Sequence, residues 1–107
     1  MKPASGETLK VRIPIPRPQL EACCRKYHIR RLALFGSVLR EDFGPDSDVD
    51  VLVDFEEGHV PGLAFFDIQR ELTEILGRDA DLNTPDDLSP YYRQQVMEEA
   101  EDLYVEA

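Results

Sequence analysis

The stretch that decides the fold reads Leu34-Phe35-Gly36-Ser37 and, after residues 38–47, Asp48-Val49-Asp50-Val51-Leu52-Val53-Asp54-Phe55. The second part alternates, so the valines and Phe55 share one face of an extended chain, and the aspartates and Leu52 share the other. The first part ends a short apolar run at a Gly-Ser pair, which is typical of a turn. The pattern predicts strands over 30–35 and 48–55 with a turn at Gly36-Ser37 between them.

The flanking sequence predicts helices and one further strand. Apolar side chains recur at helical spacing over 17–28 and over 65–76, and Gly77 is suited to the C-cap of the second helix. Residues 38–42 predict a helical turn, and residues 79–83 a third strand. Ser89-Pro90 predicts the start of a closing helix that buries one apolar face, made of Tyr92, Val96, Ala100 and Leu103. We therefore expect a small α/β (α+β) fold, a mixed sheet of about three strands packed by helices on one side.

Length and composition set the scale of the fold. A chain of 107 residues, 42% of them apolar and 32% charged, makes one small folded domain. Proline alternates with apolar and basic residues near the start, so we expect an extended arm over 1–16 and a single domain over 17–107. The sequence has neither a run of apolar residues long enough to span a membrane nor the apolar segment of a signal peptide, which predicts a cytoplasmic protein.

The charge indicates which partners suit the chain. A net charge of -10 opposes non-specific binding to nucleic acid, because that binding depends mainly on neutralising phosphates. A basic protein partner or a complex of metal and nucleotide fits this charge better. Cys23 and Cys24 are adjacent within a helical pattern, so we expect buried small side chains in a reducing compartment, and no disulfide.

The acidic side chains of the second strand have the pattern of a metal site. Residues two apart in a strand share a face, so the carboxylates of Asp48 and Asp50 lie on one side, roughly 6 to 7 Å apart along the chain. The third strand offers two further carboxylates on one face, Asp79 and Asp81, of which we prefer Asp81 because it lies deeper in the strand. The predicted metal ligands are therefore Asp48, Asp50 and Asp81.

Electrostatics gives such a cluster a need for cations. Two like charges about 4 Å apart repel by roughly 4 kcal/mol at an effective dielectric constant of 20. Oxygen ligands suit Mg²⁺, which binds proteins through one or two carboxylates together with substrate phosphates. Gly36 leaves room for a phosphate, and Ser37 offers a hydroxyl and nearby backbone N–H groups. Arg40 is one helical turn further on, where it either contacts a phosphate or pairs with Asp46 or Glu41.

These residues together resemble the signature of the nucleotidyltransferase superfamily related to DNA polymerase beta. More narrowly, the stretch from Leu34 to about Ala100 is similar to the minimal nucleotidyltransferase (MNT) family, whose members pair with HEPN-domain toxins. The resemblance is carried by Gly36-Ser37 and Asp48-Val49-Asp50, with support from Ser47, Leu76-Gly77-Arg78, Asp81-Leu82 and Thr84-Pro85.

The resemblance implies a role for each motif residue. Gly36 and Ser37 would hold the triphosphate of ATP, Asp48 and Asp50 would bind two Mg²⁺ ions, and Asp81 would activate the attacking hydroxyl. It further implies that AMP is transferred to a tyrosine of a HEPN ribonuclease toxin, which silences the toxin. Relatives that modify aminoglycosides or RNA ends carry additional substrate-binding domains, so a short chain fits an acceptor supplied by a partner.

Two alternatives stay open at this stage. The chain could act as a non-catalytic antitoxin that only covers its toxin, or it could transfer a nucleotide to a small molecule or to RNA. Among the other conspicuous residues, we expect His28 to be a surface residue at a helix end, and His59 to lie in a loop after the second strand. Tyr92 fits the buried face of the closing helix better than it fits a modification site.

Overall fold

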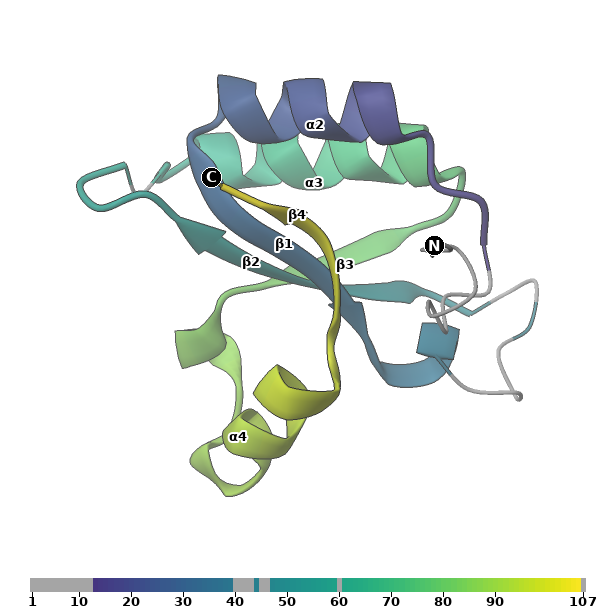
Figure 1. Cartoon of the computed structure of the whole chain (residues 1–107), viewed down its shortest axis with the longest axis vertical. Helices are drawn as coiled ribbons and strands as arrows, with labels where there is room; N and C mark the ends of the chain where they lie inside the picture. The colour runs from purple at the N-terminus through teal and green to yellow at the C-terminus, as the bar shows by residue number, and fades with distance from the viewer. Residues whose placement is uncertain (1–12, 40–43, 45–46, 60, 107) are drawn as a thin grey trace, which may run out of the picture.

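The structure is a computed structural model that describes residues 13–39, 44, 47–59 and 61–106. Two helices cover one face of a four-stranded sheet, and a third helix lies on the other side (Figure 1). In chain order the elements are α2 (Arg17–Lys26), β1 (Ile29–Phe35), the 3₁₀ turn η1 (Gly36–Leu39), β2 (Val49–Phe55), α3 (Ala64–Leu76), β3 (Ala80–Asn83), the 3₁₀ turn η2 (Pro85–Asp87), α4 (Pro90–Glu99) and β4 (Glu101–Val105).

The sheet is mixed, with strand order β3-β2-β1-β4. β1 runs antiparallel to both of its neighbours, whereas β2 and β3 are parallel. The antiparallel pair follows from the connection through η1, and the parallel pair follows from the crossover through α3, which a parallel connection requires. The α/β fold class and the mixed sheet are thus as predicted.

The main core lies between the sheet and the two helices α2 and α3. Val49, Val51 and Val53 all face this core, as the alternation over 48–55 predicts. Cys23 and Cys24 are buried in it as free thiols. α3 ends at Gly77, which has the left-handed φ of 73° that suits a glycine C-cap. Both helices thus bury the apolar stripe that their sequences predict.

The expectation that all helices pack on one side is wrong. The face of the sheet away from α2 and α3 carries Ala33 and Leu52, which are buried against Leu88 in a second, smaller core. Partly buried side chains from the end of β1 and from the last helix complete that core: Phe35, Val96, Met97 and Ala100. The alternation that directs the valines to one face directs Leu52 to the other, and α4 supplies the cover that this apolar residue needs.

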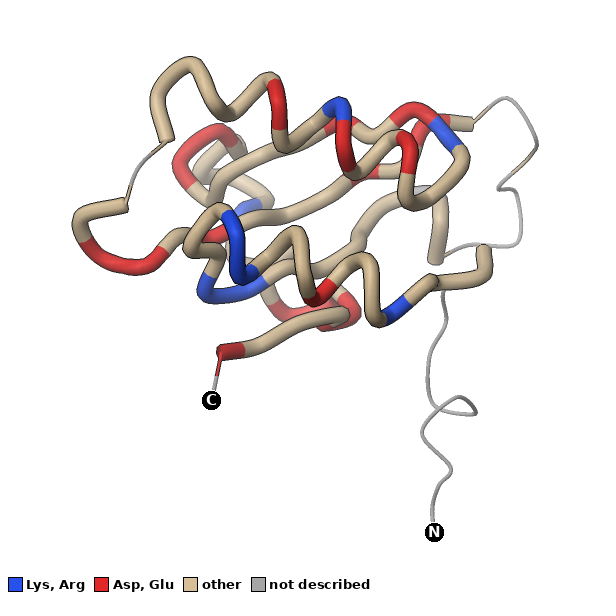
Figure 2. The backbone as a smooth tube through the Cα atoms, turned by 90° about the horizontal axis from the view of Figure 1, so that it is seen from above, with Lys and Arg blue, Asp and Glu red and all other residues tan. Residues whose placement is uncertain are grey.

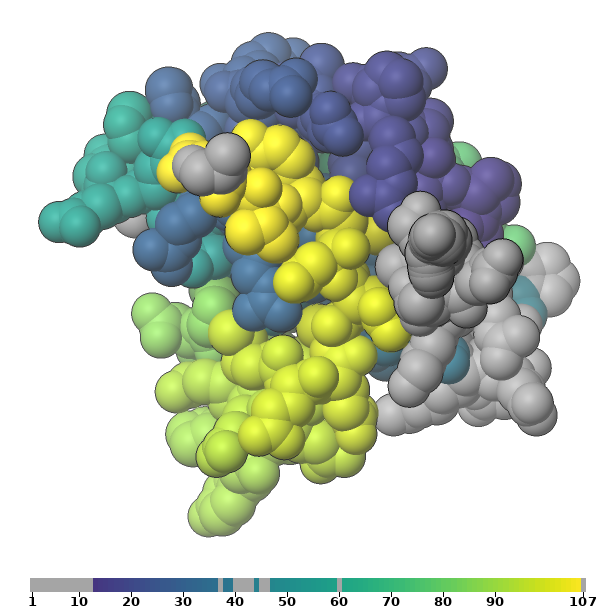
Figure 3. Space-filling view, in the orientation of Figure 1, coloured from purple at the N-terminus to yellow at the C-terminus, as the bar shows by residue number. Residues whose placement is uncertain are grey.

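The closing helix also differs from the prediction, because residues 101–105 form a fourth strand. Ala100 leaves the helix with extended backbone angles, and β4 then pairs with the free edge of β1. Arg31 on β1 forms an ion pair with Asp102 on β4 at 2.6 Å, and Arg17 donates a hydrogen bond to the Leu103 carbonyl at 3.0 Å. The backbone N–H and C=O groups along the edge of β1 need hydrogen-bond partners, which β4 supplies. This requirement outweighs the helical spacing that Leu103 also fits. β4 crosses the molecule between α2 and α4 in Figure 3.

Tyr92 is not on a buried helix face. This residue is 46% exposed, and its neighbour Tyr91 is 99% exposed. α4 contributes Val96 and Met97 to the small core, whereas Leu103 lies on β4 and belongs to the main core. The predicted cap is confirmed, since the Tyr91 N–H donates a hydrogen bond to Ser89 Oγ at 3.3 Å.

Acidic residues outnumber basic ones around the described backbone (Figure 2). Among the described residues, no helix is long and apolar enough to cross a membrane. Most of the predicted arm over 1–16 lies outside the described residues, but Ile13 is buried in the main core.

Candidate active site

The predicted glycine and the strand-borne carboxylates lie at one end of three adjacent strands, where β1 ends and β2 and β3 begin. Phe35, the last residue of β1, is the register partner of Asp50, and Asp50 is in turn the register partner of Asp81. Gly36 directly follows Phe35. Segments that are distant in the sequence are therefore brought together by the pairing of β2 with both of its neighbours.

Gly36 lies against the Asp50 carboxylate. Its φ of +78° is in the left-handed region, which favours glycine. A Cβ built on Gly36 would overlap the Asp50 carboxylate and lie 3.2 Å from its Cγ. The turn after β1 thus needs glycine for two reasons, its backbone angle and the close approach of the carboxylate.

Asp50 and Asp81 point to the same side of the sheet. Val49 and Val51 on β2, and Ala80 and Leu82 on β3, all belong to the main core, so the two aspartates between them face the opposite side. Their strands are neighbours, which sets paired Cα atoms about 4.8 Å apart. Asp50 is half-buried and Asp81 is exposed, so the pair opens to solvent on one side.

Asp48 and Asp79 lie just outside this pair. Both are exposed, and each comes directly before its strand. The Val49 N–H donates a hydrogen bond to the Asp79 carbonyl at 2.9 Å, which holds the two strand entrances together. Extending the register of β2 and β3 by one residue pairs Asp48 with Asp79, whereas Asp81 remains the partner of Asp50.

Arg78 stabilises the turn before Asp48, although the sequence pattern predicts no structural role for this residue. The Gly44 N–H donates to Ser47 Oγ at 3.1 Å, and the Ser47 N–H donates to the Gly44 carbonyl at 3.1 Å. Arg78, which precedes Asp79, donates to the same carbonyl at 2.9 Å. Gly44 and Ser47 carry a turn signal in the sequence, but no local pattern connects them to Arg78.

Ser37 and Arg40 are the two other residues that the sequence predicts to contact the nucleotide. Ser37 belongs to η1, and its predicted contact with a phosphate stays a prediction. Arg40, together with its alternative partners Glu41 and Asp46, lies outside the described residues. The predicted role of Arg40 is therefore not tested.

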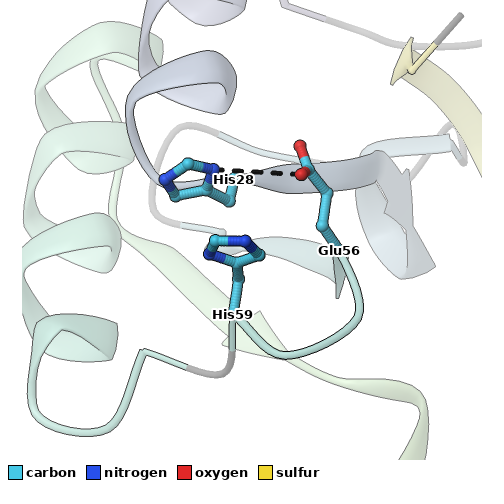
Figure 4. Close-up of side chains that lie close together, drawn as sticks. All are labelled: His28, Glu56 and His59. Carbon is cyan, nitrogen blue, oxygen red and sulfur yellow. Dashed lines mark ion pairs between the residues drawn. The ribbon is translucent and has the colours of Figure 1, made fainter.

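The two histidines lie away from this site. His28 directly precedes β1, and His59 follows the end of β2, so both lie at the opposite end of the β1/β2 pair. Their rings stack with centroids 4.0 Å apart (Figure 4). A cavity of about 680 Å³ also lies toward that end, lined by residues from β2, the following loop, α3 and η2, among them Phe55, Gly58 and Phe65.

The donor set at the carboxylate end fits magnesium. It offers carboxylate oxygens from Asp48, Asp50 and Asp81, and oxygen is the ligand that Mg²⁺ prefers. Gly36 has no side chain, so the Asp50 carboxylate lies directly against the backbone of the turn. A phosphate with its bound metal ions is a group that needs both features, close backbone approach on one side and carboxylates on the other.

The sequence resembles known nucleotidyltransferases. Residues 17–103 match the family described as Nucleotidyltransferase domain. The chain is 36% identical over 75 residues to protein adenylyltransferase MntA of Thermococcus cleftensis, covering 69% of this chain and 74% of the relative. It is 33% identical over 81 residues to "Putative protein adenylyltransferase MJ0435" of Methanocaldococcus jannaschii, covering 73% of this chain and 83% of the relative.

Solved structures share the fold. One described as a "putative minimal nucleotidyltransferase" superposes with a TM-score of 0.66 at 36% identity, covering 78% of this chain and 85% of the other. A toxin-antitoxin solved with AMP-PNP has a TM-score of 0.67 at 22% identity and covers 85% and 74% of the two chains, which shows likeness of fold. With the family match spanning most of the sequence, this chain belongs to the minimal nucleotidyltransferase family.

Proposed function

We propose that this chain transfers AMP from ATP to a tyrosine hydroxyl of a partner HEPN ribonuclease toxin, and that this transfer makes it the antitoxin of the pair. The observation that carries the proposal is the pairing of Asp50 with Asp81 beside the Gly36 turn. Support comes from relatives named protein adenylyltransferase and from fold neighbours solved as toxin-antitoxin pairs.

In this proposal the carboxylates hold the metal and the nucleotide. Asp48, Asp50 and Asp81 would bind two Mg²⁺ ions, which when bound neutralise charge on the triphosphate and lower the pKa of the attacking hydroxyl. Of the three aspartates, Asp50 has the position that the sheet fixes most firmly, because it is half-buried and its strand is paired on both sides. Gly36 lets the triphosphate approach the backbone, and Ser37 donates hydrogen bonds to it.

In the proposed reaction, Asp81 accepts the proton that the tyrosine hydroxyl loses. The tyrosine oxygen attacks the α-phosphorus of ATP, the bond from that phosphorus to the bridging oxygen breaks, and pyrophosphate leaves. A carboxylate oxygen of Asp81 takes the tyrosine proton. Asp81 suits this role because it is exposed on the side that an acceptor approaches.

The acceptor is proposed from the family resemblance, and the charge of the chain is compatible with it. A net charge of -10 favours association with a partner that has a basic face, as a ribonuclease that binds RNA has. The same charge disfavours RNA itself as the acceptor, because nucleic acid would have to approach an acidic surface. Since the reaction draws on ATP and Mg²⁺, we also propose that the protein works in the cytoplasm.

The experiment is a transfer assay with ATP labelled at the α-phosphate. Wild-type chain and Asp48→Asn are each incubated with Mg²⁺ and the proposed HEPN partner, and the label is located by gel and mass spectrometry. We expect label on a tyrosine of the partner with wild-type chain and none with Asp48→Asn.

Other outcomes separate the alternatives. Partner inhibition without label would identify a non-catalytic antitoxin. Label on RNA or on a small molecule would assign a different acceptor. Label transfer that is unchanged by Asp48→Asn would overturn the catalytic assignment itself.

A further inference from the structure

The chain contains two histidines, and the fold brings both of them to one acidic group outside the site described above. His28, Glu56 and His59 each offer one ligand atom, and these atoms lie within 4.8 Å of one another. The three side chains come from the α2–β1 turn and from the loop after β2, and they converge in Figure 4. We infer that His28, Glu56 and His59 form a binding site for a divalent transition metal ion, with Zn²⁺ as its occupant.

The backbone fixes the relative positions of the three residues. The Glu56 N–H donates to the His28 carbonyl at 2.9 Å, and the His59 N–H donates to the Glu56 carbonyl at 3.0 Å. His28 has a φ of 58°, a left-handed conformation that non-glycine residues rarely adopt. The cluster is therefore held by the ladder end of β1 and β2, and it does not depend on the chance meeting of free side chains.

The distances allow one ion to be shared after small side-chain movements. Bonds from zinc to nitrogen or oxygen are about 2.0 to 2.2 Å, so two ligands of one tetrahedral ion lie about 3.3 Å apart. His28 Nδ1 is now 3.9 Å from Glu56 Oε1, and the two side chains are 52% and 33% exposed. Because a lone pair lies in the plane of each imidazole, the stacked rings have to rotate apart when both bind the ion.

The chemistry of the ligands selects the ion. Imidazole nitrogen and carboxylate oxygen together suit Zn²⁺, whereas Mg²⁺ prefers oxygen alone. The cysteines do not compete, because both are buried, and burial raises the pKa of Cys23 to about 11 and that of Cys24 to about 12. The proposed nucleotide site has carboxylates and no histidine, so the two ends of the β1/β2 pair would bind different ions.

The test is a zinc titration of the full chain in the background Asp48→Asn, Asp50→Asn, which removes the proposed magnesium ligands. Isothermal titration calorimetry is expected to show one equivalent of Zn²⁺ bound. His59→Gln and Glu56→Gln should each weaken that binding at least about tenfold, because each removes a direct ligand. Glu57→Gln is the matched control, because Glu57 is an exposed carboxylate next to Glu56 and outside the cluster.

A second readout follows the histidines directly. With ¹⁵N-labelled histidine only two imidazoles give signals, and Zn²⁺ should shift both of them in the same titration. Thermal unfolding without zinc checks that every variant is folded. Zinc affinity that is unchanged by His59→Gln, affinity that falls equally in Glu57→Gln, or a histidine signal that does not respond would each overturn the site. His59→Gln should leave AMP transfer unchanged, which separates this inference from the proposed function.

Discussion

The two ends of the β1/β2 pair are built from the same strands but present different kinds of ligand atom. At one end, Gly36 and Asp50 meet beside Asp81, and the available ligand atoms are oxygens. At the other end, His28 and His59 stack next to Glu56, and nitrogen ligands dominate. Two antiparallel strands thus carry the two proposed ligand sets at opposite ends of one ladder.

The ends also differ in how the fold fixes their side chains. The carboxylate end lies within the sheet, where the register of three strands positions Asp50 and Asp81. The histidine end lies in the turns beyond the strands, where backbone hydrogen bonds position side chains that are more exposed. We expect substitutions at the carboxylate end to affect catalysis strongly and substitutions at the histidine end to leave it intact.

The largest effect is expected from Asp50→Asn. Asp50 is a proposed metal ligand, and its loss would remove several kcal/mol of transition-state stabilisation, so the rate of AMP transfer should fall about a thousandfold. The matched control is Asp54→Asn, on the same face of β2 but toward the histidine end, where Asp54 pairs with Arg30. This control should retain the wild-type rate. Equal losses in both variants, measured by label transfer, would refute the assignment of catalysis to one end.

The next effect separates the two candidates for the third carboxylate. Asp81→Asn should lower the transfer rate about a hundredfold or more, as expected for the loss of a general base. Asp79→Asn should have little effect, because Asp79 lies outside the Asp50–Asp81 pair. Single-turnover rates at saturating ATP measure both, and a larger loss in Asp79→Asn would exchange the two roles.

Gly36→Ala tests the close approach of the turn to Asp50. The added Cβ meets the Asp50 carboxylate and the positive φ strains alanine, so we expect about 1 to 2 kcal/mol less stability. The rate should fall about a hundredfold, since displaced catalytic groups lose their alignment. Gly58→Ala is the control, because Gly58 has a similar φ of +82° and nothing within 4 Å of an added Cβ. It should show the backbone strain in thermal unfolding without the loss of rate.

The smallest effect concerns the support of the histidine end. Two residues directly before His28 donate hydrogen bonds to Glu71 of α3. They are Lys26, the last residue of α2, and Tyr27, the C-cap of that helix. The hydrogen bonds from Tyr27 and then from Lys26 lower the pKa of Glu71 below its ordinary 4.5, so the contact stabilises the fold above pH 4.5. Glu71→Gln should lower the melting temperature slightly at pH 7, by about 2 °C.

The sign of the pH effect checks the cause of that change. As the pH falls below 4.5, Glu71 in the folded wild type becomes protonated and its advantage over glutamine is lost. The difference between the two melting temperatures should therefore shrink in acid. A difference that grows as the pH falls would show that Glu71 acts by another route.

Strand periodicity gave reliable predictions where one face of an element meets one core. The valines of β2 alternate with polar residues, and the structure places them in the main core as expected. The fourth strand was missed because Val96, Ala100 and Leu103 also fit a helical spacing. The position of α4 was not predicted because β2 carries a single apolar residue, Leu52, on its second face. One apolar residue is not enough to predict a second core.

The Gly36-Ser37 pair and the Asp48-Val49-Asp50 motif by themselves indicated the family and the proposed chemistry, because they lie close together in the sequence, at the end of one strand and the start of the next. Only the tertiary structure decided which carboxylate of the third strand faces Asp50, since parallel register depends on the crossover through α3. It alone also brought His28 to His59. Local sequence patterns report the periodicity of one element, whereas contacts between distant residues depend on how the strands pair.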